Sequence, residues 1–197
     1  PGGDFYTVQG SVNIDLGNDG CNNDTNDVPF PCIKLNISNG SNQDVLYADH
    51  LGNYSLNVQL NSQTLSPVLE NTPYFIVTPE SVSLTLTDTD TPVIQNFCII
   101  PDGIHNDLET IILPLDDARP GETIYYKLIY KNKGGTTLSG NVKFNFNDDL
   151  MNYVGATPLE DQLNVGEIIW DFIDLLPLQT KEIIFALEMN TPMDPNF

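Results

Sequence analysis

Four carboxylates within thirteen residues are the strongest candidate for chemistry in this sequence. Asp15, Asp19, Asp24 and Asp27 lie in the segment DLGNDGCNNDTND, directly after a stretch in which apolar residues alternate with polar ones. Like charges at this density repel, and a hard cation with about six to eight oxygen ligands would relieve that repulsion. The D-x-x-x-D-G opening resembles an EF-hand loop, which has acids at positions 1 and 5 and glycine at position 6. The spacing therefore predicts a Ca²⁺ site.

The predicted ligand set is only partly that of an EF-hand. The candidate ligands are Asp15, Asp19 and the backbone carbonyl of Cys21, with Asp24 and Asp27 in the ninth and twelfth roles if one residue is inserted. Gly17 occupies position 3, and Asn26 occupies position 12, where a bidentate Glu is expected. The strand-like flanks favour a structural ion over a sensory one. A solvated turn rich in Asn and Asp is the alternative interpretation.

The cysteines argue for a secreted protein. Cys21, Cys32 and Cys98 form no C-x-x-C pair, which argues against a zinc ribbon or a thioredoxin-type site. One disulfide and one free thiol are the simplest account, and a disulfide persists in an oxidising compartment. Three reduced, buried thiols in a cytosolic protein are the alternative.

Catalytic arrangements find no support in the remaining polar residues. His50 and His105 have no H-x-x-x-H or H-E-x-x-H spacing, and G-x-S-x-G does not occur. Sequence neighbours on a strand point to opposite faces, so adjacent acids make poor catalytic dyads. The acidic doublets are Asp116-Asp117, Asp148-Asp149 and Glu160-Asp161. We predict a protein that is not an enzyme.

The overall charge excludes two classes of partner. There are 27 acidic and 7 basic side chains, for a net charge of -20 at neutral pH. Nucleic acids need clustered Lys and Arg, and an anionic membrane surface would repel this protein. No apolar run approaches the roughly 20 residues that span a bilayer, so direct membrane insertion is not expected. A hydrophobic content of 40% excludes a disordered acidic tail.

Alternating hydrophobicity predicts an all-β protein made of two tandem antiparallel β-sandwiches of immunoglobulin-like or prealbumin-like type. Turn residues separate the predicted strands, for example at 39–40, 51–53 and 88–90. Pro67, Pro73 and Pro79 predict edge or irregular structure over 61–80. The predicted strands cover 6–14, 33–37, 45–47, 54–60, 82–86 and 93–100, then 108–115, 123–130, 141–146, 167–172 and 181–188.

Pro101-Asp102-Gly103 and the restarted strand pattern predict a boundary near residue 101, giving domains 1–100 and 101–197. A second domain that is cut short at its C-terminal end is the alternative to a complete one. Residues 1–100 hold 11 acids and one base, Lys34, and residues 101–197 hold 16 acids and six bases, so each half has a net charge of -10. Carboxylates in the first half have almost no cation to neutralise them.

Two elements of the first half resemble the B-type repeats of bacterial surface adhesins. They are GSVNID running into NDGC at 10–21, and Ala48-Asp-His-Leu-Gly-Asn-Tyr54 opening a strand. The resemblance implies a prealbumin-like sandwich with a calcium loop, to which Asp15, Asp19 and the Cys21 carbonyl correspond directly. It also implies that the second element is a hairpin whose tyrosine, Tyr54, enters the core.

The second half resembles the tandem β modules of large type IX-secreted Bacteroidota exoproteins. The motifs are ARPG at 118–121, YKLIYKNKG at 126–134 and WDFIDLLP at 170–177, with NFC at 96–98 and HNDLE at 105–109 before them. They imply an extracellular or cell-surface location and a β fold, and they imply no activity.

The resemblance points to a disulfide between Cys21 and Cys98. The same pair meets if the first and last strands of the first domain lie side by side, because Cys21 follows the first strand and Cys98 lies on the last. Cys32, on the next strand, would then be a buried free thiol. A Cys21–Cys32 bond is the alternative.

These observations predict a non-enzymatic structural or adhesive module of a secreted or surface bacterial protein, a calcium-rigidified spacer or stalk. Its partners would be neighbouring modules of the same polypeptide. Tyr125, Tyr126, Tyr130 and Trp170 could form a sugar platform, but Trp170 within an apolar strand is expected in the core. The alternatives are an adhesin module that binds a surface glycan or protein, and an ancillary region of a secreted hydrolase whose catalytic domain lies outside this chain.

Overall fold

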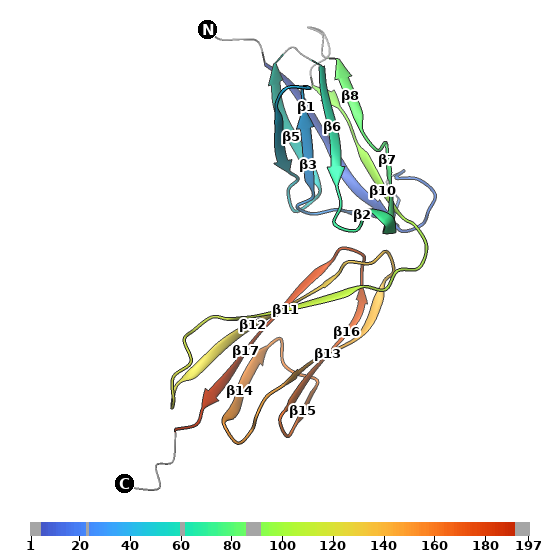
Figure 1. The fold of residues 1–197 in the computed structure, drawn as a ribbon. Helices are drawn as coiled ribbons and strands as arrows, with labels where there is room; N and C mark the ends of the chain where they lie inside the picture. Colours follow the sequence, from blue (N-terminus) through green and yellow to red (C-terminus); the bar gives the residue numbers. More distant parts are fainter. Residues whose placement is uncertain (1–4, 23, 60–61, 86–91, 192–197) are drawn as a thin grey trace. The chain divides into compact units, whose positions relative to one another are not determined.

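The computed structural model describes residues 5–22, 24–59, 62–85 and 92–191, and the turn predicted at 88–90 lies outside them. The chain divides into two compact units, Pro1–Ile104 and His105–Phe197. Strands account for nearly all the regular structure of the described residues, with one short 3-10 turn at Thr72–Tyr74. The prediction of an all-β protein is confirmed, and each unit is described below by itself (Figure 1).

The first sheet of unit 1 is organised around its longest strand, β1 (Phe5–Asp15). The first part of β1 pairs antiparallel with β5 (Asn53–Gln59) and parallel with β9 (Val93–Ile94). Its last part pairs antiparallel with β2 (Asp27–Pro29) and parallel with β10 (Phe97–Pro101), which in turn pairs with β7 (Phe75–Thr78). The first and last strands of the unit therefore lie side by side.

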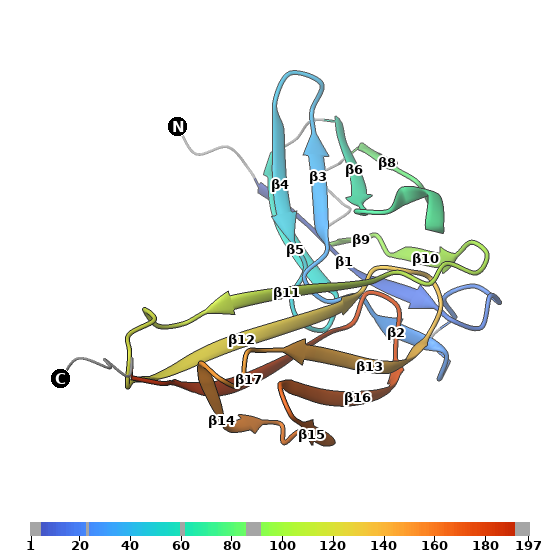
Figure 2. The same cartoon turned by 60° about the horizontal axis from the view of Figure 1, so that its bottom comes forward.

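The second sheet of unit 1 has the order β4-β3-β6-β8 (Figure 2). Its strands are β3 (Lys34–Ser38), β4 (Gln43–Tyr47), β6 (Ser62–Val68) and β8 (Val82–Thr85). The expectation of edge or irregular structure over 61–80 was wrong for β6, which lies between two strands. Pro67 is tolerated because β8 pairs only with Ser62–Leu65, so beyond Leu65 one side of β6 is a sheet edge.

The core of unit 1 joins these two sheets. Val8 and Val12 of β1, Leu35 of β3 and Leu65 of β6 are at most 1% exposed. Leu84 of β8 packs against a cluster that includes Val8, so both sheets contribute to one apolar interior. Alternate residues of β1 point into this core, which leaves the other face of the strand polar.

Unit 2 is a second pair of sheets. One has the order β11-β12-β17-β14, and the other has the order β13-β16-β15. The strands are β11 (Leu108–Pro114), β12 (Thr123–Asn132), β13 (Leu138–Asn145), β14 (Met151–Thr157), β15 (Gln162–Asn164), β16 (Glu167–Leu175) and β17 (Thr180–Met189). Sequence periodicity missed β14, in which the register shifts between Tyr153 and Gly155 and breaks the alternation.

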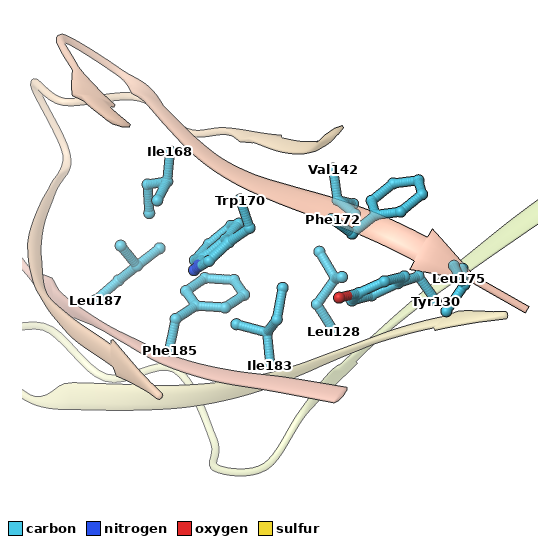
Figure 3. Packing of buried hydrophobic residues seen from close by; sticks show 10 residues of the cluster. All are labelled: Leu128, Tyr130, Val142, Ile168, Trp170, Phe172, Leu175, Ile183, Phe185 and Leu187. Carbon is cyan, nitrogen blue, oxygen red and sulfur yellow. The ribbon is translucent and has the colours of Figure 1, made fainter. Parts of the chain in front are cut away.

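The core of unit 2 contains the only tryptophan of the chain (Figure 3). Trp170 is 2% exposed, and its ring centroid lies 5.6 Å from that of Phe185 on the facing sheet. Its indole N–H donates to the carbonyl of Pro158 over 3.3 Å. The expectation that Trp170 is a core residue is confirmed, and the residue is not available for a sugar platform.

A buried asparagine fixes the loop after β12. Asn132 is fully buried, and its Nδ2 donates to the carbonyls of Thr136 (2.8 Å) and Leu175 (3.0 Å). Its Oδ1 accepts from the N–H of Gly134 over 3.0 Å. A Cβ at Gly134 would overlap the carbonyl oxygen of His105. The asparagine and glycine of the YKNKG motif therefore have a structural role.

Candidate functional site

The acidic loop connects β1 to β2, and its first and last acids face each other. Asp15 ends β1, Asp27 begins β2, and the two are paired in the antiparallel register. The N–H of Leu16 donates to the carbonyl of Asn26 over 3.1 Å, which closes the loop at its base. The hairpin therefore presents residues 16–26 from two well-defined strand ends.

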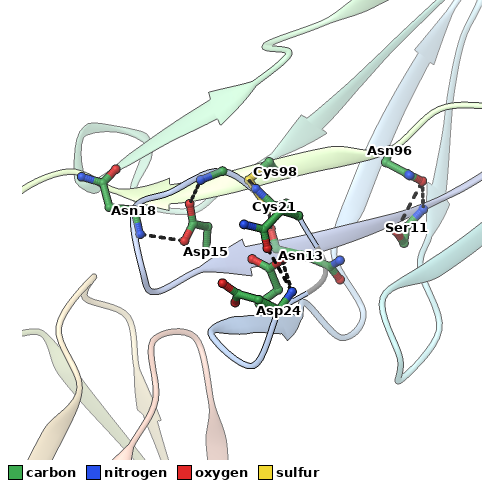
Figure 4. Close-up of a disulfide and its surroundings, with 11 residues drawn as sticks. Ser11, Asn13, Asp15, Asn18, Cys21, Asp24, Asn96 and Cys98 are labelled. Atoms are coloured by element: carbon green, nitrogen blue, oxygen red, sulfur yellow. Dashed lines mark hydrogen bonds between the residues drawn. A yellow bond between two sulfur atoms is a disulfide. The ribbon is translucent and has the colours of Figure 1, made fainter.

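Asp15 is the best-anchored acid of the loop (Figure 4). Its side chain is fully buried, and its Oδ1 accepts the N–H of Asn18 over 2.7 Å. Its Oδ2 accepts the N–H of Gly20 over 2.7 Å. Asn18 and Gly20 have φ values of 56° and 90°, so these two bonds hold the chain in a tight left-handed turn. The carboxylate is stabilised by two backbone donors and organises the first half of the loop.

Asp24 and Asp27 organise the second half. The N–H of Asp24 lies 3.2 Å from Oδ2 of Asp27, and Oδ1 of Asp24 accepts the N–H of Asn26 over 2.7 Å. These contacts form a local Asx-type turn, which Asn and Asp favour. The alternative interpretation of the loop, a turn built by its own polar side chains, thus describes part of what is observed.

Asp19 lies in the combined field of the other three acids. Lost hydration raises the pKa of Asp19, and the negative charges of Asp24, Asp15 and Asp27 raise it further. The pair with Asp24 also includes a side-chain hydrogen bond. The loop therefore concentrates negative charge around one exposed carboxyl, which is the electrostatic condition that a bound cation would relieve.

The geometry gives a donor set for calcium without a preformed coordination shell. Carboxylate and carbonyl oxygens are the ligands that Ca²⁺ prefers, and the loop supplies them. Within the part of the chain that the structure describes, however, no three His, Cys, Asp or Glu side chains converge on one ion-sized position. Binding would require the carboxylates of the loop to rearrange.

A disulfide ties the same loop to the last strand of unit 1 (Figure 4). It joins Cys21 to Cys98, the pair favoured over Cys21–Cys32, with Cα atoms 5.5 Å apart and a sequence separation of 77. The parallel pairing of β1 with β10 places Cys98 opposite Asn13, close to where the loop leaves β1. Topology therefore brings the two cysteines together.

Cys32 is a free thiol, as expected, but the expectation that it is buried was wrong. Its thiol is free and exposed, and the residue lies at a turn before β3. Cys32 has a φ of 56°, and its N–H donates to the carbonyl of Asp49 over 3.1 Å. The residue was expected on the next strand, whereas it lies in the turn that precedes β3, where its side chain is exposed.

The Ala48–Tyr54 element is a connection between sheets, which corrects the hairpin that the resemblance implied. It joins β4 of one sheet to β5 of the other. Asp49 Oδ1 accepts the N–H groups of Asn53 (2.9 Å) and Leu51 (2.8 Å). Both bonds lower the pKa of Asp49, and the bond from Asn53 has the larger effect. Tyr54 does enter the core, where it is 5% exposed and donates to the carbonyl of Gln95.

In the Glu160-Asp161 doublet of unit 2, both side chains accept hydrogen bonds from neighbouring strands. Asp148 and Asp149 lie in a turn, as expected. Glu160 accepts a hydrogen bond from the hydroxyl of Tyr153. Burial is the main cause that raises the pKa of Tyr153, and the hydrogen bond to Glu160 raises it further. Asp161 Oδ2 accepts the N–H of Asp171 over 2.7 Å. These contacts account for the polar character of the β14–β16 region.

Together these features define a two-unit, all-β protein whose first unit is closed by a disulfide. No helix in the described residues has the length and apolarity needed to cross a membrane. No protein-family model matches the chain, and no curated protein matches it. The resemblances to B-type adhesin repeats and to type IX-secreted modules therefore stay predictions.

Several solved structures show a distant likeness. A DUF3823 family protein from Parabacteroides merdae is 11% identical, with a TM-score of 0.37, over 92% of this chain and 81% of that one. A proposed carbohydrate binding protein from Bacteroides uniformis is 13% identical, with a TM-score of 0.37, over 95% and 80%. The T6 backbone pilin of Streptococcus pyogenes is 11% identical, with a TM-score of 0.30, over 94% and 54%. All three TM-scores lie below 0.5.

Proposed function

We propose that this chain is a non-enzymatic structural or adhesive module of a secreted or cell-surface bacterial protein, acting as a spacer between neighbouring modules. The observation that carries the proposal is the Cys21–Cys98 bond, which ties the loop after the first strand of unit 1 to its last strand. A disulfide with this role is maintained in an oxidising compartment and is uncommon in the cytosol.

The location can be tested on protein recovered from the cells that produce it. Peptide mapping without reduction should yield Cys21 and Cys98 in one linked fragment, and Cys32 should react with a thiol reagent added to intact cells. Recovery of all three cysteines as reduced thiols from the cytosolic fraction would reject the proposal. The type IX route is the expected secretion pathway.

The second part of the proposal is that Ca²⁺ stiffens the loop between β1 and β2. The ligands would be Asp15, Asp19, the Cys21 carbonyl, Asp24 and Asp27. Support comes from the raised pKa of Asp19, caused by lost hydration and by the surrounding carboxylates. Unit 1 also has only one basic side chain in residues 1–100 with which to neutralise its acids.

Calcium should raise the Tm of unit 1, because an ion that binds only the folded state stabilises it by mass action. Differential scanning calorimetry would compare 2 mM CaCl₂, 2 mM MgCl₂ and excess EGTA. The Asp19→Asn/Asp24→Asn variant should lose the response, and Asp44→Asn, which alters an exposed acid of β4 outside the loop, should keep it. An identical Tm in CaCl₂ and EGTA would reject calcium as a ligand.

A further inference from the structure

Unit 1 carries an open groove that lies apart from the acidic loop. The groove has a volume of 670 Å³, and residues of β1, β4, β5 and β9 and of the segments beside them line it. Its volume falls within the range of about 300–1,000 Å³ typical of small-ligand sites. It is the candidate for a function that a spacer alone does not need.

The floor of the groove is polar. It is the face of β1 opposite the core, where Gln9 pairs with Ser55 and Ser11 pairs with Asn53 on β5. Side chains of directly paired residues lie on the same face of a sheet, so two amides and two hydroxyls form one surface. These groups supply both hydrogen-bond donors and acceptors.

Two further polar groups on the rim are held in fixed orientations. Asn96 Oδ1 accepts the N–H of Ser11 over 2.9 Å and lies 3.3 Å from its hydroxyl (Figure 4). Because the oxygen is used in this way, the Nδ2 of Asn96 is the group available to a ligand. Asp49 is held by the backbone N–H groups of Leu51 and Asn53. Preorganised groups of this kind lower the entropy cost of binding.

Apolar side chains stand beside the polar floor. Tyr47, at the end of β4, is 62% exposed, and Ile94, on β9, is 58% exposed. In the sheet, β1 lies between β5 and β9, so Ile94 lies on the side of β1 opposite β5. The groove thus combines an exposed aromatic ring, an aliphatic side chain and a floor of amides and hydroxyls.

We infer that this groove binds a neutral oligosaccharide. A sugar ring has apolar C–H faces, which pack on aromatic and aliphatic side chains, and hydroxyls, which need donors and acceptors together. Charge selects among glycans: residues 1–100 carry 11 acids and one base, and Asp49 lines the groove itself. A sialylated or sulfated glycan would be repelled.

The pairing of β1 argues against a peptide that adds a strand to β1. Extended peptides bind most often by adding a strand to a free sheet edge. At the groove, Gln9 pairs with Ser55 on one side and with Ile94 on the other, so β1 has no free edge there. A ligand that lies over β1 is therefore recognised there by side chains, which suits a ligand rich in hydroxyls.

The shape of the floor depends on Gly10. A Cβ at this position would overlap the carbonyl oxygen of Gln95, the same oxygen that accepts the hydrogen bond of the Tyr54 hydroxyl. The segment after β9 can therefore lie directly against β1 and bring Asn96 to the rim. The groove is thus a built feature of unit 1.

The test is a glycan microarray probed with the whole chain, residues 1–197, followed by titration of the best neutral oligosaccharide by isothermal calorimetry. Tyr47→Ala should weaken binding about tenfold or more, since an exposed aromatic contact is lost. Asn96→Asp keeps the acceptor for Ser11 and removes the donor, and should weaken binding comparably. Phe5→Ala, which removes an aromatic side chain of β1 that is 62% exposed and does not line the groove, is the matched control and should leave the affinity within about twofold.

Three outcomes would overturn the inference: no binding to any neutral glycan, a preference for anionic glycans, or an affinity unaffected by both groove variants. This inference goes beyond the spacer role. If the chain binds no neutral glycan, the disulfide and calcium experiments still test the spacer role. If those experiments reject the spacer role, the glycan titration still tests the groove.

Discussion

Removing the Cys21–Cys98 disulfide should destabilise unit 1 more than any single side-chain truncation. The bond closes a loop of 77 residues in the unfolded chain. Loop-closure entropy for that length is worth about 4.5 kcal/mol at 25 °C. Domains of this size have a free energy of unfolding of about 5–15 kcal/mol, so unit 1 would keep only a small part of its stability.

The perturbation is the double variant Cys21→Ser/Cys98→Ser, because a single substitution would leave a second free thiol in addition to that of Cys32. With a urea m-value of about 1.5 kcal/mol per M, the loss corresponds to a midpoint about 3 M lower. Cys32→Ser is the control and should not move the midpoint, since its thiol is free and exposed.

The unfolding of the two units can be followed by different spectroscopic signals in this assay. Its only tryptophan, Trp170, lies in the core of unit 2, so tryptophan fluorescence follows unit 2 while far-UV circular dichroism follows both. The dichroism transition of unit 1 should shift and the fluorescence transition should stay. The loop-entropy reasoning would be refuted if the urea midpoint of unit 1 fell by less than about 0.7 M, which corresponds to roughly 1 kcal/mol.

Two other residues give predictions that a urea titration can check. Asn132→Ala should destabilise unit 2 by about 3 kcal/mol, because it leaves the carbonyls of Thr136 and Leu175 and the N–H of Gly134 without this partner; a loss below about 1 kcal/mol would contradict this role. Burial raises the pKa of Tyr54 well above its ordinary value of 10.0, so the stability it contributes is present below about pH 10 and is lost as the pH rises further. Tyr54→Phe should cost about 1 kcal/mol at pH 8 and reduce the alkaline loss of stability in unit 1; identical pH profiles for wild type and variant would contradict the assignment.

The strands with strict alternation were predictable, and the exceptions have identifiable causes. β1 and β12 alternate clearly, and each buries one apolar face. β16 and β17 each contain three consecutive buried residues, at 168–170 and 185–187, and were predicted from their apolar content. β14 was missed because its register shift at Gly155 interrupts the pattern. β6 was misjudged because proline was assumed to exclude a paired strand, whereas only one side of the strand at Pro67 needs a backbone donor.

The candidate sites differ in how far sequence could reveal them. The acidic loop is contiguous, so its composition alone marks it. The groove is assembled from Gln9, Tyr47, Asn53 and Asn96, which lie far apart in the chain. Only the parallel pairing of β1 with β9 and the passage from β4 to β5 bring them together, and no local pattern encodes either feature.

The position of the disulfide has a mechanical consequence. Tension applied to unit 1 through the start of β1 and the end of β10 would pass along β1 to Cys21, cross the covalent bond to Cys98 and leave along β10. The 76 residues between the two cysteines lie outside this path. Their unfolding could not lengthen the chain, and about 250 Å of contour would be withheld from extension. Under load, unit 1 would act as a nearly inextensible link even if its core lost its packing.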